Sequence, residues 1–226
     1  MDTIESHSAT PSRPRRRWWT AAATSVAATA AALTFTAGDV SAARNVNVLA
    51  DEITTAADRA VLEFDVYQAS GDLVDYLAYS ASRTETARLA ARELGYNEFA
   101  MADAWQEAPL EHQRAVLAAM TQVGVPYRTN TSIEDTGFDC SGLTTYAWAQ
   151  AGHQLVRQST SQIRNAEPLD RSTAKAGDLV QYPGHVMMYL GVDDAIIHSV
   201  QTGRTVEVDT ISDRRSNSVR FGDPTR

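Results

Sequence analysis

Apolar residues recur at three- and four-residue steps between residues 43 and 108, which is the spacing of one helix face. The first run consists of Leu49, Ile53, Ala57, Ala60, Val61 and Phe64. A second run extends from 73 to 94, and Gly71 and Gly95 are natural helix stops. We expect an α-helical accessory segment whose aromatic side chains pack between helices. It carries no cofactor motif.

Residues 109–226 change from a helical to a strand-like pattern. A helix face with Val116 and Met120 ends at Gly124, and another helix is expected to start near Cys140. Short β-branched runs follow at 179–182, 185–190, 195–200, 205–208 and 218–221. Their length and the turn residues between them predict an antiparallel meander. Helices followed by strands indicate an α+β fold, with helices packed on a short antiparallel sheet.

The first 42 residues have the pattern of an export signal peptide. A cluster of arginines between 13 and 17 precedes an uncharged stretch from 20 to 36, and Val40 and Ala42 fit a small-residue cleavage site. A retained membrane anchor is the alternative, but threonines dilute the stretch, which is shorter than the roughly 20 strongly apolar residues of a stable span. Sec and twin-arginine export both stay open.

Charge and length limit the function further. The formal net charge is −8 and no long basic run occurs beyond the N-terminus, which argues against a nucleic-acid partner. We expect a secreted or cell-wall protein with no stable membrane span after signal cleavage. Three regions are predicted: the signal peptide 1–42, the helical accessory segment 43–108, and a catalytic domain 109–226. The accessory segment could pack on the catalytic part, cover its cleft or dock a protein partner.

Candidate chemistry centres on Cys140, the only cysteine of the chain. Without an internal disulfide partner, a thiol in a secreted protein is free or bonds another molecule. Asp139 precedes it as a potential helix cap, so Cys140 is expected in the first helical turn. The helix dipole there favours a thiolate and provides N–H donors for an oxyanion. The alternative is a small buried hydrophobic residue.

A nucleophilic thiol requires a base, and that base requires a group that orients it. His112 and His153 lie in polar stretches and are expected to be solvated, whereas His185 and His198 lie in or beside apolar strands. Satisfied strand histidines are the alternative for each of these two taken alone. We therefore take His185 as the candidate base and His198 as the candidate orienter.

Strand register decides whether the two strand histidines can meet. If Leu190 and Ala195 form a pair across the turn, position 198 faces 187, and His185 lies diagonally from His198 on the same face. A one-residue slip would separate them. A helix N-terminus packed on that face would bring Cys140 to His185.

Two other chemistries use the same residues. Cys140, His185 and His198, with Asp139, could bind zinc, but no pair has the close spacing typical of zinc ligands. Ser141 lacks the GxSxG context of a serine nucleophile. We expect no metal and no cofactor.

Six motifs occur in order over roughly residues 110–221. They are Gly124-Val-Pro-Tyr127, Gly137-Phe-Asp-Cys-Ser-Gly-Leu143, Arg157-Gln-Ser159 with Gln162, Ala176-Gly-Asp-Leu179, His185-Val-Met-Met-Tyr-Leu-Gly191 and Ile196-Ile-His-Ser199. Together they resemble the NlpC-type family of papain-like bacterial cell-wall cysteine endopeptidases. One motif alone would be weak, whereas six in order are specific.

The resemblance implies a papain-like fold that cleaves peptidoglycan stem peptides, typically between D-glutamate and a diamino acid. It implies Cys140 as nucleophile, His185 as general base and His198 as third polar residue. A second set matches positions that line the family's substrate cleft: Tyr127, Asp139 and Ser141. Arg157 matches a motif position whose role the sequence does not assign.

The chain departs from the family pattern just after Tyr127. Residues 128–131, Arg-Thr-Asn-Thr, replace the usual Trp-Gly-Gly, and Val156 replaces a usual proline. Losing the glycines stiffens a loop near the expected cleft. Two alternatives to an endopeptidase follow: a non-catalytic module that binds the cell wall or a partner, and a cell-wall amidase or acyltransferase. We also hypothesise that the accessory segment partly inhibits the enzyme.

Overall fold

The computed structural model describes residues 46–226, which lie in one compact unit. The predicted signal peptide, residues 1–42, lies outside the described residues. No helix within 46–226 is both long and apolar enough to cross a membrane.

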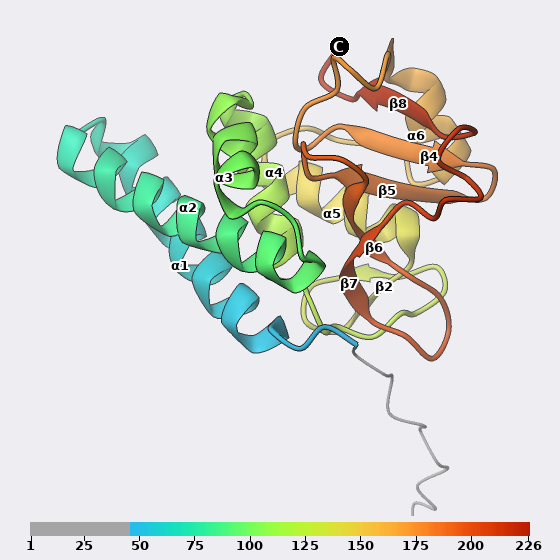
Figure 1. Ribbon diagram of the computed structural model, residues 1–226, viewed down its shortest axis with the longest axis horizontal. Coiled ribbons are helices and arrows are strands. Elements are labelled where there is room, and N and C mark those ends of the chain that lie inside the picture. The colour runs from blue at the N-terminus through green and yellow to red at the C-terminus, as the bar shows by residue number, and fades with distance from the viewer. Residues whose placement is uncertain (1–45) are drawn as a thin grey trace, which may run out of the picture. The chain divides into compact units, whose positions relative to one another are not determined.

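Four helices come first in the described chain. They are α1 (Ala50–Ser70), α2 (Leu73–Leu94), α3 (Glu98–Glu107) and α4 (Leu110–Met120). Figure 1 shows α1 and α2 as a long pair that extends past the sheet, with α3 and α4 between that pair and the sheet. Gly71 and Gly95 end α1 and α2 with φ of 68° and 70°, which favour glycine over residues with a Cβ. The predicted helical segment and both stops are confirmed.

Aromatic side chains hold the helices together, as expected. The rings of Phe64 and Tyr79 meet edge to face at 5.1 Å, and Tyr67 stacks on Tyr79 at 6.2 Å. Trp105 is fully buried and its indole N–H donates to the carbonyl of Leu190, 3.0 Å away. This bond attaches α3 to the C-terminal half.

The C-terminal half is an antiparallel sheet with two further helices. The sheet has the order β3-β8-β4-β5-β6-β7, and a separate two-stranded ribbon precedes it. The bounds are β1 (Ser132–Ile133), β2 (Gly137–Phe138), α5 (Cys140–Gln150), α6 (Ser159–Asn165), β3 (Glu167–Leu169), β4 (Leu179–Tyr182), β5 (His185–Tyr189), β6 (Ala195–Ser199), β7 (Val206–Thr210) and β8 (Arg220–Asp223). The α+β class is confirmed.

The predicted antiparallel meander is confirmed for β4 to β7, but the prediction is wrong for the last strand, β8. β8 does not pair with β7; the chain returns across the sheet and β8 pairs with β4 on one side and β3 on the other. β3 was not predicted, because Glu167-Pro168-Leu169 contains a proline, which is tolerated on the edge that β3 occupies.

The two faces of the sheet carry separate apolar clusters. Val186, Met188 and Ile197 pack with α5 and the N-terminal helices in the main core. Met187 and Ile196, which alternate with them, pack with residues of the β7–β8 connection in a smaller cluster.

The main core continues across the predicted boundary between residues 108 and 109. The Tyr79 hydroxyl donates to Gln113 Oε1 at 2.5 Å, and Arg83 donates to the same oxygen at 2.9 Å. Helix α2 is thereby bonded to α4 through buried polar groups as well as apolar contacts. The domain boundary stays a prediction, and the two parts share one core.

Candidate active site

Cys140 is the first residue of α5, as predicted, and Asp139 caps the helix. The Asp139 carboxylate accepts the N–H of Gly142 at 2.8 Å. Cys140 itself is 9% exposed. The thiol thus lies where unpaired N–H groups and the helix dipole stabilise a negative charge.

Arg157 fixes this helix start. Its guanidinium donates to Asp139 Oδ2 and to Ser141 Oγ, each at 2.7 Å, and to the carbonyl of Thr131 at 3.1 Å. Burial alone would raise the pKa of Asp139, but Arg157 and the N–H groups of Gly142 and Asn130 hold it below its ordinary value. The sequence assigns no role to Arg157, which here positions two of the predicted cleft residues, Asp139 and Ser141.

The atypical loop 128–131 is part of the same network. The Thr131 carbonyl accepts the N–H of Asp139 at 3.0 Å, and the Asn130 N–H donates to Asp139 Oδ2 at 2.8 Å. A Cβ on Gly142 would lie 2.0 Å from the Thr131 oxygen, so only glycine lets the loop approach. The loop expected to affect the cleft therefore supports the nucleophile's helix directly.

The sheet side of the site holds both strand histidines in contact. Pairs Met188–Ile197 and Tyr189–Ile196 confirm the predicted register. His185 Nε2 lies 2.8 Å from His198 Nδ1, a hydrogen-bond distance. Because that bond uses Nε2 of His185, its Nδ1 remains for another partner.

The helix packs on a different face from the one expected. Strand alternation puts His185 and His198 on the face of Met187 and Ile196, whereas α5 packs in the core on the opposite face. The chain just before α5 nevertheless reaches the end of β6, where Ser199 Oγ donates to the Phe138 carbonyl at 2.7 Å. The segment that precedes Cys140 therefore contacts the end of β6, next to His198.

Two tyrosines connect the thiol with the sheet side. Burial raises the pKa of Tyr127, and negative charge at Cys140 and Asp139 adds to the shift. Burial also raises the pKa of Tyr182, where Cys140 again contributes. The Tyr182 ring stacks on His185 with centroids 5.1 Å apart. Cys140 thus contributes to the pKa shift of a ring that stacks on His185, although Cys140 and His185 form no hydrogen bond within the described residues.

His185 is held in its neutral form by its surroundings. Burial lowers its pKa to about 3, and His198 and Arg215 act in the same direction. The imidazole is therefore neutral near pH 7. A neutral ring has a lone pair for a proton, although the lowered pKa makes it a weaker base than a free imidazole.

Asp209 extends the polar chain beyond the predicted residues. Its Oδ2 lies 3.4 Å from His198 Nε2, without the alignment of a hydrogen bond. Burial opposes ionisation, yet the contact with His198 and the Thr210 N–H hold the pKa of Asp209 below its ordinary value. The alternating Glu207 and Asp209 in a strand beside β6 were the available sequence signal.

His112 was expected to be solvated, and that expectation is wrong. Its side chain is 2% exposed, and its Nε2 lies 3.1 Å from Asp178 and 3.6 Å from Asp223. Within 46–226 these three residues bring possible metal-ligand atoms within 4.8 Å of one another. The zinc set of Cys140, His185 and His198 does not gather in this way within that range.

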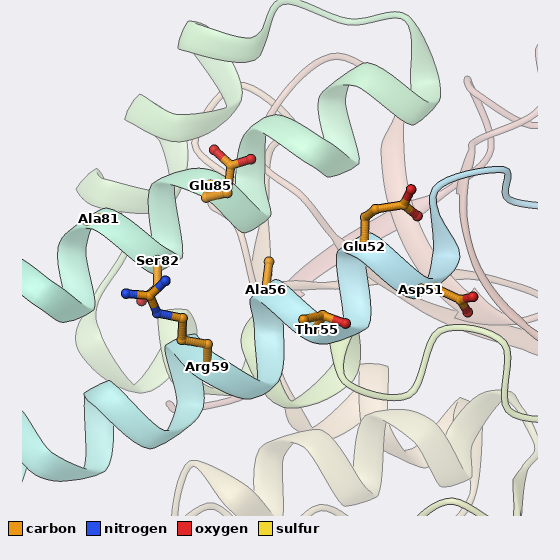
Figure 2. A pocket seen from close by; sticks show the side chains of 8 residues that line it. All are labelled: Asp51, Glu52, Thr55, Ala56, Arg59, Ala81, Ser82 and Glu85. Carbon is orange, nitrogen blue, oxygen red and sulfur yellow. The ribbon is translucent and has the colours of Figure 1, made fainter.

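An open groove lies away from these residues, between α1 and α2. Figure 2 shows Ala56 and Ser82 among its lining residues, with the carboxylates Asp51, Glu52 and Glu85 and the cation Arg59 around them. Its volume is about 520 Å³. No cysteine and no histidine line it, so it is distinct from the Cys140 site.

Comparison with known proteins identifies the C-terminal half. Residues 124–222 match the NlpC/P60 family. The match confirms the resemblance drawn from the six motifs. Helices α1 to α4 lie outside the matched segment.

Among curated relatives, the chain is similar to murein DD-endopeptidase MepH of Escherichia coli, with 35% identity over 42% of this chain and 38% of the relative. A probable endopeptidase of Corynebacterium glutamicum, Cgl2188, is 38% identical over 45% of this chain and 50% of its own length. The match thus spans half or less of each of these two relatives.

Two solved structures are also similar. An NlpC/P60 family protein from Bacillus cereus is 26% identical, with 50% of this chain and 39% of that chain covered and a TM-score of 0.46. RipD from Mycobacterium tuberculosis, described as a non-catalytic NlpC/p60 domain protein adapted to peptidoglycan binding, is 26% identical, with 51% and 98% covered and a TM-score of 0.42.

Proposed function

We propose that this protein is a secreted peptidoglycan endopeptidase that uses Cys140 as nucleophile, His185 as general base and His198 as the residue that orients it. The observation that carries the proposal is the 2.8 Å contact between the two histidines on the same domain as a cysteine at a capped helix start. The matched relatives are named as endopeptidases, and MepH as a murein endopeptidase.

The proposed amide cleavage proceeds through Cys140 and His185. His185 Nδ1 takes the thiol proton and Cys140 Sγ attacks the amide carbonyl, forming a C–S bond while the carbonyl electrons move to oxygen. N–H groups at the start of α5 stabilise that oxyanion. The C–N bond then breaks as His185 returns the proton to the amine, and water hydrolyses the thioester to release the acid and the thiol.

The substrate side of the proposal concerns the stem peptide. Tyr127, Asp139 and Ser141 are assigned to the cleft, and the bond between D-glutamate and a diamino acid is the expected target. Asp139 and Ser141 are engaged by Arg157, so their contribution to the cleft is a fixed surface at the helix start rather than mobile side chains.

The direct test is digestion of defined muropeptides by the full mature protein. Wild type should release fragments, and Cys140→Ala should release none while retaining its circular dichroism spectrum. Mass spectrometry of the products identifies the bond cleaved, which also separates an endopeptidase from an amidase or acyltransferase. Equal behaviour of wild type and Cys140→Ala would refute the proposal.

A non-catalytic module that binds the cell wall is the second candidate. It is favoured by the altered loop 128–131 and by the absence, in the described residues, of a hydrogen bond between Cys140 and His185. Hydrogen bonds between catalytic residues often become short only when substrate is bound, so the reactivity of the Cys140 thiol must be measured. An activated Cys140 should be alkylated well below pH 8 and lose that reactivity in His185→Ala, whereas ordinary thiol behaviour in both proteins would favour the binding module.

The location and the helical segment complete the proposal. Export through the predicted signal 1–42 is testable by N-terminal sequencing of secreted protein, which should begin near Ala43. The inhibitory role hypothesised for residues 43–108 receives no support from the contacts. No hydrogen bond or ion pair between residues 46–108 and the rest of the described chain involves Tyr127, Cys140, His185 or His198. Docking of a protein partner on this segment stays a prediction.

A further inference from the structure

The connection between β7 and β8 crosses the sheet beside the candidate active site. Thr210 pairs with Ala195, at the end of the sheet remote from the histidines, whereas Arg220 pairs with Gln181, next to Tyr182. The chain from 211 to 219 must therefore run diagonally from one end of the sheet to the other. Ile211 and Val219 pack in the cluster on the face that carries His185.

Arg215 lies within this crossing and its backbone is fixed. Its N–H donates to the Ser212 carbonyl at 2.8 Å, and its own carbonyl accepts the N–H of Ser218 at 2.8 Å and the Ser218 hydroxyl at 3.0 Å. The guanidinium carbon lies 3.9 Å from the centroid of the Tyr182 ring. A turn thus holds a cation against one aromatic face.

That face belongs to the ring that stacks on the candidate base. Tyr182 and His185 are inclined by 29° with centroids 5.1 Å apart, and His185 contacts His198. Arg215, Tyr182 and His185 therefore follow one another in successive contacts. The positive charge of Arg215 contributes to the lowered pKa of His185, and Cys140 contributes to the raised pKa of Tyr182.

Arg215 differs from Arg157 and Arg204 in having no acidic partner within residues 46–226. Arg157 is paired with Asp139 and Arg204 with Glu207, whereas the Arg215 side chain is exposed and forms no ion pair in that range. A guanidinium stacked on a ring keeps its N–H groups free at the edge, where they match a carboxylate in bidentate geometry.

We propose that Arg215 is a specificity-determining residue that binds a free carboxylate of the stem peptide beside the scissile amide. This inference rests on the proposed function. Exposure leaves the guanidinium open to a ligand, and its contact with Tyr182 puts that ligand next to His185. Stem peptides supply the required chemistry, because a γ-linked glutamate keeps a free α-carboxylate and a diamino acid carries a carboxylate of its own.

The experiment compares three muropeptides: one with both carboxylates free, one amidated at the glutamate α-carboxylate, and one amidated at the diamino acid. Wild type, Arg215→Gln and Arg215→Lys are measured for kcat and KM. Arg214→Gln is the matched control, since it removes the same charge from the adjacent exposed residue. Circular dichroism establishes that each variant is folded.

Losing a charge-assisted bidentate contact should raise KM for the free peptide about 10- to 100-fold in Arg215→Gln, with kcat changed less than about threefold. Arg215→Lys should recover part of the loss, and Arg214→Gln should match wild type. With the peptide amidated at the recognised carboxylate, wild type and Arg215→Gln should have similar KM values. The amidation that removes the difference identifies which carboxylate is bound.

Equal KM values for wild type and Arg215→Gln on the free peptide would overturn the inference while leaving the endopeptidase intact. If wild type cleaves no muropeptide, the proposed function fails separately. Calorimetric titration of the free peptide into Cys140→Ala and into Cys140→Ala/Arg215→Gln then still tests carboxylate binding. Equal affinities in that titration would also reject the role of Arg215.

Discussion

The two sides of the candidate active site are built differently. On the helix side, Asp139 accepts hydrogen bonds from Gly142, Asn130 and Arg157, so the start of α5 is held from three directions. On the sheet side, His185 and His198 share one hydrogen bond, and His198 Nε2 meets Asp209 only at 3.4 Å.

This difference in hydrogen bonding matches the different tasks proposed for the two sides. A nucleophile must be held where the carbonyl will lie, and a fully hydrogen-bonded helix start provides that rigidity. A base must transfer a proton twice, so its ring gains from partners that tolerate both protonation states. We therefore expect substitutions on the sheet side to change the rate, and substitutions on the helix side to change stability first.

The largest expected effect comes from His198 on the sheet side. Replacing it by alanine removes the group proposed to orient His185, and kcat should fall about 100-fold, the lower range of general acid–base contributions. The melting temperature should change little. His198→Asn should recover part of the rate, because an amide can still bond His185 Nε2.

The control for this variant is His153→Ala, which removes a half-buried imidazole that contacts only the Trp148 ring. Its kcat should stay within about twofold of wild type, since the site is untouched. If His198→Ala kept the kcat of wild type, His198 would not be the residue that orients His185.

Gly142→Ala tests the helix side. Alanine in a helix normally stabilises by about 0.5–1 kcal/mol over glycine. Here the added Cβ would lie 2.0 Å from the Thr131 carbonyl oxygen, which forces the loop 128–131 away. We expect a net loss of about 1–3 kcal/mol in the free energy of unfolding, measured by urea denaturation. Unchanged or higher stability would show that the loop does not support α5.

Arg157→Gln should have a smaller effect on the same side. It leaves the buried Asp139 with backbone donors only, and we expect a loss of about 1–2 kcal/mol, limited because the Arg157 side chain is 40% exposed. Arg164→Gln is the control, because Arg164 is an exposed arginine on α6 that bonds only Ser161. Equal urea midpoints for both variants would contradict a clamping role for Arg157.

The smallest effect concerns pH. His185 has a lowered folded-state pKa of about 3, whereas an unfolded histidine titrates near 6.5. As pH falls below about 6.5, only the unfolded chain takes up this proton, so the free energy of unfolding decreases until about pH 3. His185→Gln should remove about 1 kcal/mol of the decrease between pH 7.5 and 6, measured from urea midpoints. A decrease identical to wild type would mean that His185 is not buried in neutral form.

Local sequence signals predicted one part of this site well. The cap Asp139 and the helix start at Cys140 follow from short-range preferences, because a capping side chain bonds an N–H only two or three residues away. The contact of His185 with His198 followed from pairing Leu190 with Ala195, because strand periodicity is two and the turn fixes register. Both predictions concern neighbours within about 15 residues or across one turn.

Long-range partners were not predictable in the same way. Nothing near Arg157 in the sequence identifies Asp139, Ser141 and Thr131 as its acceptors, which lie 16 to 26 residues before it. The side of the sheet on which α5 packs was predicted wrongly, because alternation assigns residues to faces without telling which face a helix covers.

By itself, the sequence determined helices α1, α2, α4 and α5, the sheet strands from β4 to β7, the lone thiol, the two candidate histidines and the resemblance to the NlpC-type family. Those features depend on periodicity, capping and motif order, which are local. Only the tertiary structure decided that β8 returns to β4, that the crossing chain lays Arg215 on Tyr182, and that the accessory helices share the core. These depend on which distant surfaces pack together, and a linear pattern of polar and apolar residues does not contain that choice.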